Sequence, residues 1–236
     1  MEFRNQVLAE LTPSQLTLLQ PHLIERHLVS GEVLYQPGDR VEAVFFPSTA
    51  VTSVVTVMED GRCVESATLG NESVVGAVPA LSEAPSHARV FIQVPGDAWQ
   101  LTASIFRRHV LNDPALLKII LRHVQRDIGQ SEQSVACNAL HNVVQRLARW
   151  ILLTQDRVGD SRIPLTQEYL AIMLGVQRTT VTSAAQSLKK AGLIRYMRGR
   201  IDVTNRAGLK RVACECYTGS DQPEVAPRER LHVVGE

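Results

Sequence analysis

The C-terminal fold is decided by residues 167–186, which read QEYLAIMLGVQRTTVTSAAQ. A small residue, Ala171, stands in the fifth place of this stretch, Gly175 in the ninth and the β-branched Val181 in the fifteenth. Ala171 lets two helices approach closely, Gly175 takes the positive φ of a tight turn, and Val181 fills the wedge between the helices. The stretch predicts a helix-turn-helix whose second helix covers residues 177–191.

The outer side of this predicted second helix is polar at its N-terminal end. In a recognition helix such positions enter the major groove of DNA, where Arg178 can bond to guanine O6 and N7 and threonines can touch thymine methyl groups or phosphates. The alternative is a helix face that is merely solvated. We expect DNA contacts just ahead of the first helix and along the second, at Thr166, Gln177, Arg178, Thr179, Thr180, Thr182 and Ser183.

A short β-hairpin is predicted next, over residues 194–203. Arg195, Arg198 and Arg200 fall within six residues of it, around a turn at Gly199. Three arginines are more than a hairpin needs, and this placement suits contact with DNA phosphates. The hairpin is therefore predicted to be the wing of a winged helix-turn-helix.

The net charge of +1 conceals an uneven distribution of charge along the 236 residues. Residues 1–139 hold 10 basic and 15 acidic side chains, residues 140–217 hold 13 and 5, and residues 218–236 hold 2 and 4. A basic domain joined to an acidic one is expected of a DNA-binding regulator with a separate sensor domain.

Ahead of this basic part, residues 31–101 consist of short β-rich runs separated by turn signals such as Pro37-Gly38-Asp39 and Pro95-Gly96-Asp97. Strands of this length and spacing are typical of an antiparallel barrel or jelly roll. Residues 1–29 place leucines at near-helical spacing, which predicts a short helical lead-in.

A long helix is predicted to start at Pro114, with Asp113 as its cap. Positions on one side of this helix follow one another at alternating intervals of four and three residues, which is the heptad pattern of a contact between two helices. The pattern favours a homodimer, and the alternative is a helix packed on its own barrel. The expected dimer interface consists of Leu117, Leu121, Val124, Ile128, Ser131 and Val135.

These features predict an α+β chain with four parts. Residues 1–111 form a sensor domain, an N-terminal antiparallel β-roll, and residues 112–139 form the long dimerisation helix. Residues 140–217 form the C-terminal winged helix-turn-helix, and residues 218–236 are polar enough to predict a disordered tail.

The order of these parts resembles that of the Crp/Fnr family of bacterial transcription regulators. In the N-terminal half the resemblance rests on residues 31–34, 37–39, 44–46 and 60–61, and in the C-terminal half on 165–168, 174–176, 178–181 and 192–194. It implies a cyclic-nucleotide-binding-like jelly roll, a homodimer on a palindromic operator, and RNA polymerase as a partner. It also puts the guanine-reading arginine at Arg178, whereas Thr179 stands where the family often has a glutamate, so the usual half-site is not implied.

The sensor pocket departs from family members that bind cyclic AMP, which hold the ribose with a Gly-Glu pair and the phosphate with an Arg-Ser pair. Ala77 cannot accept a hydrogen bond from a ribose hydroxyl, and neither Ser86 nor His87 supplies a permanent bidentate cation. Cyclic AMP bound in the usual way is therefore not expected, and the effector stays unassigned. The matching pocket positions are Gly76, Ala77, Val78, Ser86, His87 and Arg89.

The cysteines are too few and too scattered for a disulfide framework, and residues 1–30 lack the cysteine cluster of the iron–sulfur members of the family. Cys137 and His141 lie four residues apart, and Cys214 and Cys216 end the winged domain, so these four could form a zinc site that locks the hinge. No second closely spaced pair fixes the geometry. Buried free thiols are therefore favoured, and no metal site is assigned.

Other classes of protein are less favoured. Catalysis is not expected, since no paired catalytic carboxylates, phosphate loop or nucleophile elbow is recognisable. No run of eighteen apolar residues or signal peptide occurs, which favours the cytoplasm and excludes a membrane partner. The alternative function is a small-molecule sensor whose winged domain binds a protein, and the wing's arginines count against it.

Overall fold

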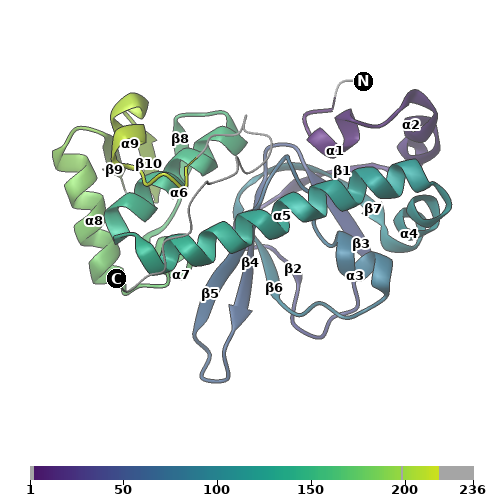
Figure 1. Ribbon diagram of the computed structural model, residues 1–236, viewed down its shortest axis with the longest axis horizontal. Helices are drawn as coiled ribbons and strands as arrows, with labels where there is room; N and C mark the ends of the chain where they lie inside the picture. The colour runs from purple at the N-terminus through teal and green to yellow at the C-terminus, as the bar shows by residue number, and fades with distance from the viewer. Residues whose placement is uncertain (1–2, 198, 218–236) are drawn as a thin grey trace, which may run out of the picture.

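The computed structural model describes residues 3–197 and 199–217. The predicted disordered tail, residues 218–236, and Arg198 of the predicted wing lie outside the described residues. Three parts follow one another as expected: a β-roll flanked by helices, one long helix, and a small domain of helices with a hairpin (Figure 1).

The N-terminal domain is an antiparallel β-roll made of two sheets, with strand orders β1-β7-β3 and β2-β6-β4-β5. Helices that precede and follow the strands in the sequence pack against the sheets. The rings of Phe46 and Phe106 meet edge to face in the core of the domain. The jelly-roll prediction is thus confirmed. Its elements are α1 (Gln6–Ala9), α2 (Pro13–Leu19), the 3₁₀ turn η1 (Gln20–His22), β1 (Ile24–Leu28), β2 (Val33–Tyr35), β3 (Ala43–Pro47), β4 (Val51–Val57), β5 (Cys63–Leu69), α3 (Ala77–Ser82), β6 (Arg89–Val94), β7 (Gly96–Thr102) and α4 (Ala103–Asn112).

The long helix α5 (Pro114–Leu140) begins where the sequence predicts it. The carboxylate of Asp113 accepts hydrogen bonds from the backbone N–H groups of Ala115 and Leu116, at 2.9 and 3.1 Å, and so satisfies two donors that the helix leaves unpaired. α5 crosses the front of the molecule from the β-roll to the C-terminal domain (Figure 1).

The C-terminal domain has its own core, centred on Leu147 and Ile151 of α6 and on Val181 of the next-to-last helix. Its small sheet has the strand order β8-β10-β9. The elements are α6 (Val143–Val158), β8 (Arg162–Pro164), α7 (Gln167–Leu174), α8 (Arg178–Lys190), β9 (Ile194–Met197), β10 (Arg200–Val203) and α9 (Arg206–Val212).

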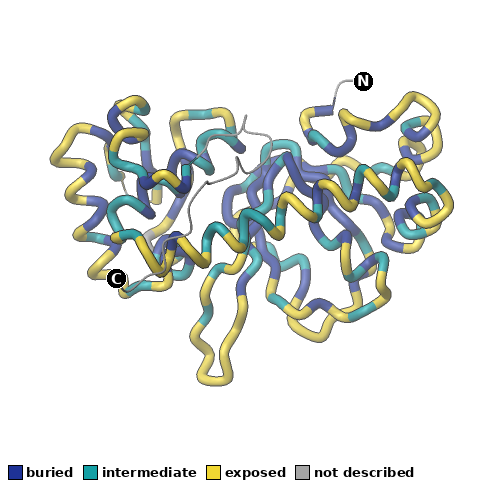
Figure 2. Tube along the Cα trace, viewed as in Figure 1, coloured by how far each residue is buried: buried dark blue, intermediate teal, exposed yellow. Residues whose placement is uncertain are grey.

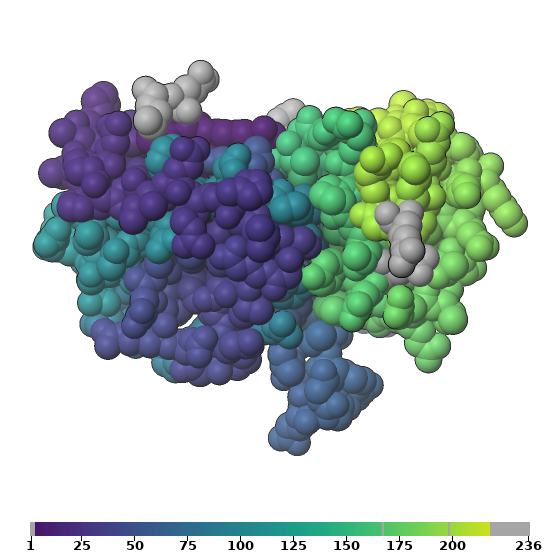
Figure 3. Space-filling model, turned by 180° about the vertical axis from the view of Figure 1, so that it is seen from behind, coloured from purple at the N-terminus to yellow at the C-terminus, as the bar shows by residue number. Residues whose placement is uncertain are grey.

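The two domains are packed against each other. Val51 of β4 and Val94 of β6 belong to the same buried cluster as the C-terminal core, and α7 lies against β5. The rings of Phe91 on β6 and Tyr169 on α7 are 5.5 Å apart between centroids. Seen from behind, the winged domain sits beside the β-roll, while the β4–β5 hairpin projects beyond both (Figure 3).

Candidate nucleic-acid interface

The helix-turn-helix forms as the sequence predicts. Thr166 caps α7 by accepting a hydrogen bond from the Tyr169 N–H at 3.3 Å, and Gly175 ends the helix with a φ of 61°. α8 begins at Arg178, and Gly192, with a φ of 69°, follows its end. Glycine adopts such positive φ values without strain, so both turns depend on a glycine, and Gly175 is the one that the sequence pattern predicts.

One face of α8 is buried in the domain core, and the other is open to solvent. Val181, Ala184 and Leu188 are buried against α6 and α7. The predicted DNA contacts Gln177, Arg178, Thr179, Thr180 and Ser183 are exposed, whereas Thr182 is half-buried and donates its hydroxyl to the Arg178 carbonyl at 2.9 Å.

The exposed face of α8 extends further than the sequence prediction. Thr179, Ser183, Gln186 and Lys190 are spaced by four, three and four residues, so they share one side of the helix, and all four are exposed. Gln186 and Lys190 were not predicted as contacts. The helical spacing from Thr179 is the signal that could have found them.

Thr180 and Ser183 also border an open groove of about 470 Å³ between α8 and the start of α6. The side chains of Thr180 and Ser183 can therefore point either into this groove or toward a ligand bound to the outer face of α8. These two residues therefore stand at the edge of the α8 face, with Thr179 nearer to its centre.

The wing is present as the antiparallel pair β9–β10, in which Arg195 lies opposite Asp202 and Arg200 opposite Met197. Arg195 is exposed, but the guanidinium of Arg200 forms an ion pair with Asp202, with 2.8 Å between Nε and Oδ1. The two wing arginines that the structure describes are thus not equivalent: Arg195 presents its charge to solvent, and the charge of Arg200 is partly neutralised.

Arg178 lies close enough to the wing to act on it electrostatically. Burial raises the pKa of Tyr196 on β9, and the positive charge of Arg178 opposes that rise. The start of α8 and the wing therefore lie near each other.

The predicted effector positions lie in different surroundings. Gly76 starts α3 with a φ of 84°, and a Cβ atom at this position would lie 2.5 Å from the hydroxyl of Tyr35. Tyr35 is buried and donates that hydroxyl to the Ala43 carbonyl at 2.6 Å. Burial raises its pKa. An aromatic side chain therefore fills the space in front of the α3 N-terminus, next to buried Ala77.

The remaining effector positions are either exposed or engaged in local contacts. Val78 and His87 are exposed, and the buried hydroxyl of Ser86 is used locally, donating to the Ala88 carbonyl at 2.8 Å. Arg89 lies over the ring of Phe91, 5.7 Å from its centroid, on the opposite face of β6 from Val90 and Ile92 in the core. Arg89 therefore faces the outside of the β-roll.

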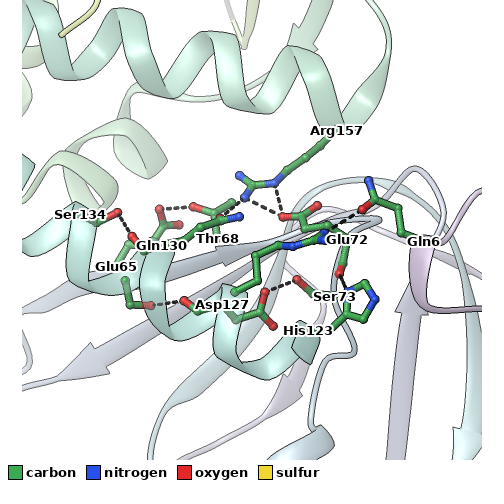
Figure 4. A network of polar contacts seen from close by, with 12 residues as sticks. Gln6, Glu65, Thr68, Glu72, Ser73, His123, Asp127, Gln130, Ser134 and Arg157 are labelled. Carbon is green, nitrogen blue, oxygen red and sulfur yellow. Dashed lines mark hydrogen bonds and ion pairs between the residues drawn. The ribbon is translucent and has the colours of Figure 1, made fainter. Parts of the chain in front are cut away.

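A buried polar network joins the β-roll to the C-terminal domain (Figure 4). Arg157 of α6 forms an ion pair with Glu72, with 2.7 Å between Nη2 and Oε1, and also donates to the side-chain oxygen of Gln130 at 2.9 Å. Asp127 accepts a hydrogen bond from Ser73 at 2.7 Å. The network links the loop after β5, α5 and α6, which belong to all three parts of the chain.

The cysteine and histidine residues of the hinge also come together. The ligand atoms of Cys137, His141, Cys214 and Cys216 all lie within 4.8 Å of one another. Burial raises the pKa of the Cys137 thiol to about 12. Cys63 lies apart from this group, on β5.

The comparisons with known proteins agree with this architecture. Residues 25–113 match the family model of the cyclic nucleotide-binding domain, and residues 145–212 match that of the Crp-like helix-turn-helix domain. Among the helices in the described ranges, none has the length and apolar character needed to cross a membrane.

Curated relatives and solved structures point the same way. The global nitrogen regulator of Synechococcus elongatus is 24% identical over 190 residues, covering 76% of this chain and 85% of the relative. The structure of FixK2 from Bradyrhizobium japonicum has a TM-score of 0.70 at 16% identity, covering 81% of this chain and 98% of that one. A putative Crp/Fnr regulator from Eubacterium rectale has a TM-score of 0.68 at 15% identity, covering 89% and 98%.

The curated relatives are regulators and not enzymes, and residues 145–212 match a Crp-like helix-turn-helix domain, which confirms the expectation from the sequence that the chain is not an enzyme. With a cyclic-nucleotide-binding-like β-roll ahead of a Crp-like helix-turn-helix, the chain belongs to the Crp/Fnr family of transcription regulators.

Proposed function

We propose that this regulator binds a palindromic operator in double-stranded DNA as a homodimer, with α8 of each chain in a major groove. The observation that carries the proposal is the polar outer face of α8, where Arg178, Thr179 and Ser183 are exposed beside a basic wing. In such a dimer the two recognition helices enter successive major grooves about 34 Å apart.

The surface of α5 supports the dimer. Leu121, Ile128 and Val135 follow one another at intervals of seven residues and have 54%, 46% and 71% of their surface exposed in the single chain. Heptad spacing is the pattern with which two helices pack along a common seam. The intervening seam positions Leu117, Val124 and Ser131 are half-buried. A second copy of α5 would cover the exposed apolar stripe.

The proposal includes control by a signal at the β-roll. Because Tyr35 occupies the space before α3 and Ala77 replaces the ribose acceptor, the effector is expected to differ from cyclic AMP in its binding mode. Binding of the effector to the β-roll would shift α5 and so alter the spacing of the two α8 helices. The regulator is expected to act on promoters in the cytoplasm. RNA polymerase is its expected partner at the DNA.

DNA binding can be tested with the region upstream of the protein's own gene, by footprinting and by titration at several salt concentrations. Arg178→Ala should weaken binding to the specific site by about 1–3 kcal/mol and reduce discrimination at one base position. Arg195→Ala should weaken binding to all sequences and lower the salt slope by about one.

Arg40→Ala is the matched control, because Arg40 is exposed in the β-roll and away from α8. It should leave both affinity and salt slope unchanged. If the unmodified chain and the Arg178→Ala variant bind every sequence equally, the specific-regulator proposal fails, since phosphate contacts alone carry no sequence information.

A further inference from the structure

The hinge between α5 and the DNA-binding domain carries a cluster of three cysteines and one histidine from two distant segments. Cys137 lies in the last turn of α5 and His141 caps that helix, while Cys214 and Cys216 follow α9. All three cysteines are buried, and they form a buried cluster separate from the two domain cores.

The spacing of the four ligand atoms suits a single tetrahedral ion. The sulfur atoms of Cys137 and Cys214 are 3.5 Å apart, and the sulfur of Cys216 is 3.5 Å from Nδ1 of His141. With zinc–sulfur bonds of about 2.3 Å, two thiolates on one zinc lie about 3.8 Å apart and never more than about 4.6 Å. The observed limit of 4.8 Å for all pairs is close to this range, whereas ligands on different irons of a cluster would lie farther apart.

The groups around the four residues are those that a metal site requires. Nδ1 of His141 points at a cysteine sulfur while its Nε2 is 3.0 Å from the carboxylate of Glu215, an arrangement that fixes the ring and makes the ligating nitrogen more basic. The amide of Gln133 donates to the Cys216 sulfur at 3.0 Å. Such a bond stabilises the negative charge of a thiolate.

Two arginines of α6 supply positive charge beside the cluster. The charge of Arg149 acts on Cys137, and that of Arg146 interacts with Cys137 and Cys214. Three thiolates and one neutral imidazole around Zn²⁺ leave a net charge of −1, which these arginines offset. Arg149 also donates its Nε to the Cys216 carbonyl at 3.1 Å and so positions the ligand loop.

The second ligand pair is held in place independently of the cluster. The hydroxyl of Tyr217 donates to Asp156 of α6 at 2.8 Å, and Arg206 forms an ion pair with the same carboxylate at 2.5 Å. The loop that carries Cys214 and Cys216 is therefore fixed on α6, facing the end of α5.

We propose that Cys137, His141, Cys214 and Cys216 bind one zinc ion, which clips the end of the DNA-binding domain to the end of α5. The clip spans the hinge at residues 141–142, where α5 stops and α6 starts. A rigid hinge holds α8 at a defined angle to the dimer helix. The metal site stands on the cluster alone, and only its effect on DNA affinity rests on the function proposed above.

The metal site is tested on the full chain, purified with a reducing agent and supplied with zinc. Elemental analysis should find one zinc per chain, and replacement by Co²⁺ should give the visible d–d bands of a tetrahedral site with thiolate-to-metal charge transfer. Cys214→Ser and His141→Ala should lose the ion, whereas Cys63→Ser should keep it, because Cys63 lies outside the cluster. Glu215→Gln should weaken zinc binding about 10–100-fold.

The His141→Cys variant distinguishes metal loss that follows from a missing ligand from metal loss that follows from misfolding. This variant supplies a fourth thiolate and should bind one Co²⁺ with a changed charge-transfer spectrum. The proposal is overturned if the supplied chain holds no stoichiometric zinc, if Cys63→Ser lowers zinc content as much as Cys214→Ser, if mass spectrometry finds a Cys137–Cys214 disulfide in the reduced preparation, or if the bound metal is iron with sulfide.

Two further measurements separate the clip from the proposed DNA function. Removing zinc with a chelator should speed hydrogen exchange at the end of α5 and after α9, and should lower operator affinity about tenfold or more. Faster exchange without any DNA binding in either form leaves the site standing and refutes the proposed function. Unchanged exchange refutes the clip.

Discussion

Arg157 joins the two domains through a buried ion pair. Its side chain is 7% exposed and that of its partner Glu72 is 9% exposed, so their ion pair is almost fully removed from water. Gly70 lies so close that a Cβ atom there would come within 2.7 Å of the Arg157 side chain. The loop after β5 is therefore shaped around the aliphatic part of the Arg157 side chain.

Glu72→Gln is expected to destabilise the chain by about 3–5 kcal/mol, because it leaves the buried Arg157 charge without its counter-charge. The free energy of unfolding measured in urea tests this. Asp60→Asn, which breaks the exposed ion pair with Arg62, should change stability little. Equal effects of the two substitutions would show that burial does not govern the Arg157 pair.

Individual contacts were the least predictable level of this molecule. The pair of Arg157 and Glu72 joins residues 85 positions apart, and no local pattern connects them. The pair of Arg200 and Asp202 can be predicted from the sequence, since the side chains of residues two apart on a strand lie on the same face. The four cluster residues stand out in the sequence, but only the folded chain brings Cys214 and Cys216 to the end of α5.

α5 is the element on which the proposed dimer depends. Its inner face contributes Leu116, Ile120 and His123 to the β-roll, while the outer face leaves an apolar stripe in solvent, as the alternating burial along the helix shows (Figure 2). His123 is anchored by a 2.7 Å hydrogen bond between its Nδ1 and the Glu72 carbonyl. One face therefore fixes the helix to its own chain, and the other is available to a second copy.

Ile128→Glu should convert the dimer to monomer while leaving the folded chain intact, because Ile128 is 46% exposed in the single chain and a charge there costs little before association. Sedimentation equilibrium measures the change, and circular dichroism checks the fold. Gln125→Glu, at an exposed position outside the seam, is the control. A dimer that survives Ile128→Glu would place the interface elsewhere.

Elements were predicted well where their signals are local. The cap and proline at residues 113–114 and the glycine of the turn at Gly175 act within a few residues of chain, so the sequence alone indicates where α5 and α7 begin or end. Which face of β6 carries Arg89 depends on the register of the whole sheet. The local sequence around Arg89 therefore does not determine whether its side chain faces the inside of the β-roll.

At the scale of the whole molecule, three links add to the packing between the domain faces in holding the DNA-binding domain. α5 continues from the β-roll to the hinge, the buried network of Arg157 ties α6 to the loop after β5, and the cysteine cluster joins the end of α5 to the segment after α9. The network occupies the junction of all three parts. A change of charge there therefore acts on the relative position of the domains as well as on stability.

Asp127 makes this junction sensitive to pH. Burial raises its pKa to about 7, and the nearby charge of Glu72 also raises it, while Ser73, Arg157 and Arg126 oppose the rise. In the unfolded chain the same carboxyl group has a pKa of about 3.9. Between these two values the folded chain holds a proton that the unfolded chain has released. The stability contributed by this group is therefore complete below about pH 4 and is lost as the pH rises to about 7.

Asp127→Asn should therefore remove part of the fall in stability between pH 5 and 8, since the amide stays neutral throughout. Urea unfolding at both pH values should show a smaller difference for this variant than for the unmodified chain. Glu132→Gln, at an exposed position on the same helix, should keep the full difference. If Asp127→Asn keeps it too, another group governs the pH dependence. If the difference shrinks only for Asp127→Asn, the proton is held where α5 and the β-roll meet α6, and acidification strengthens the junction that orients α8.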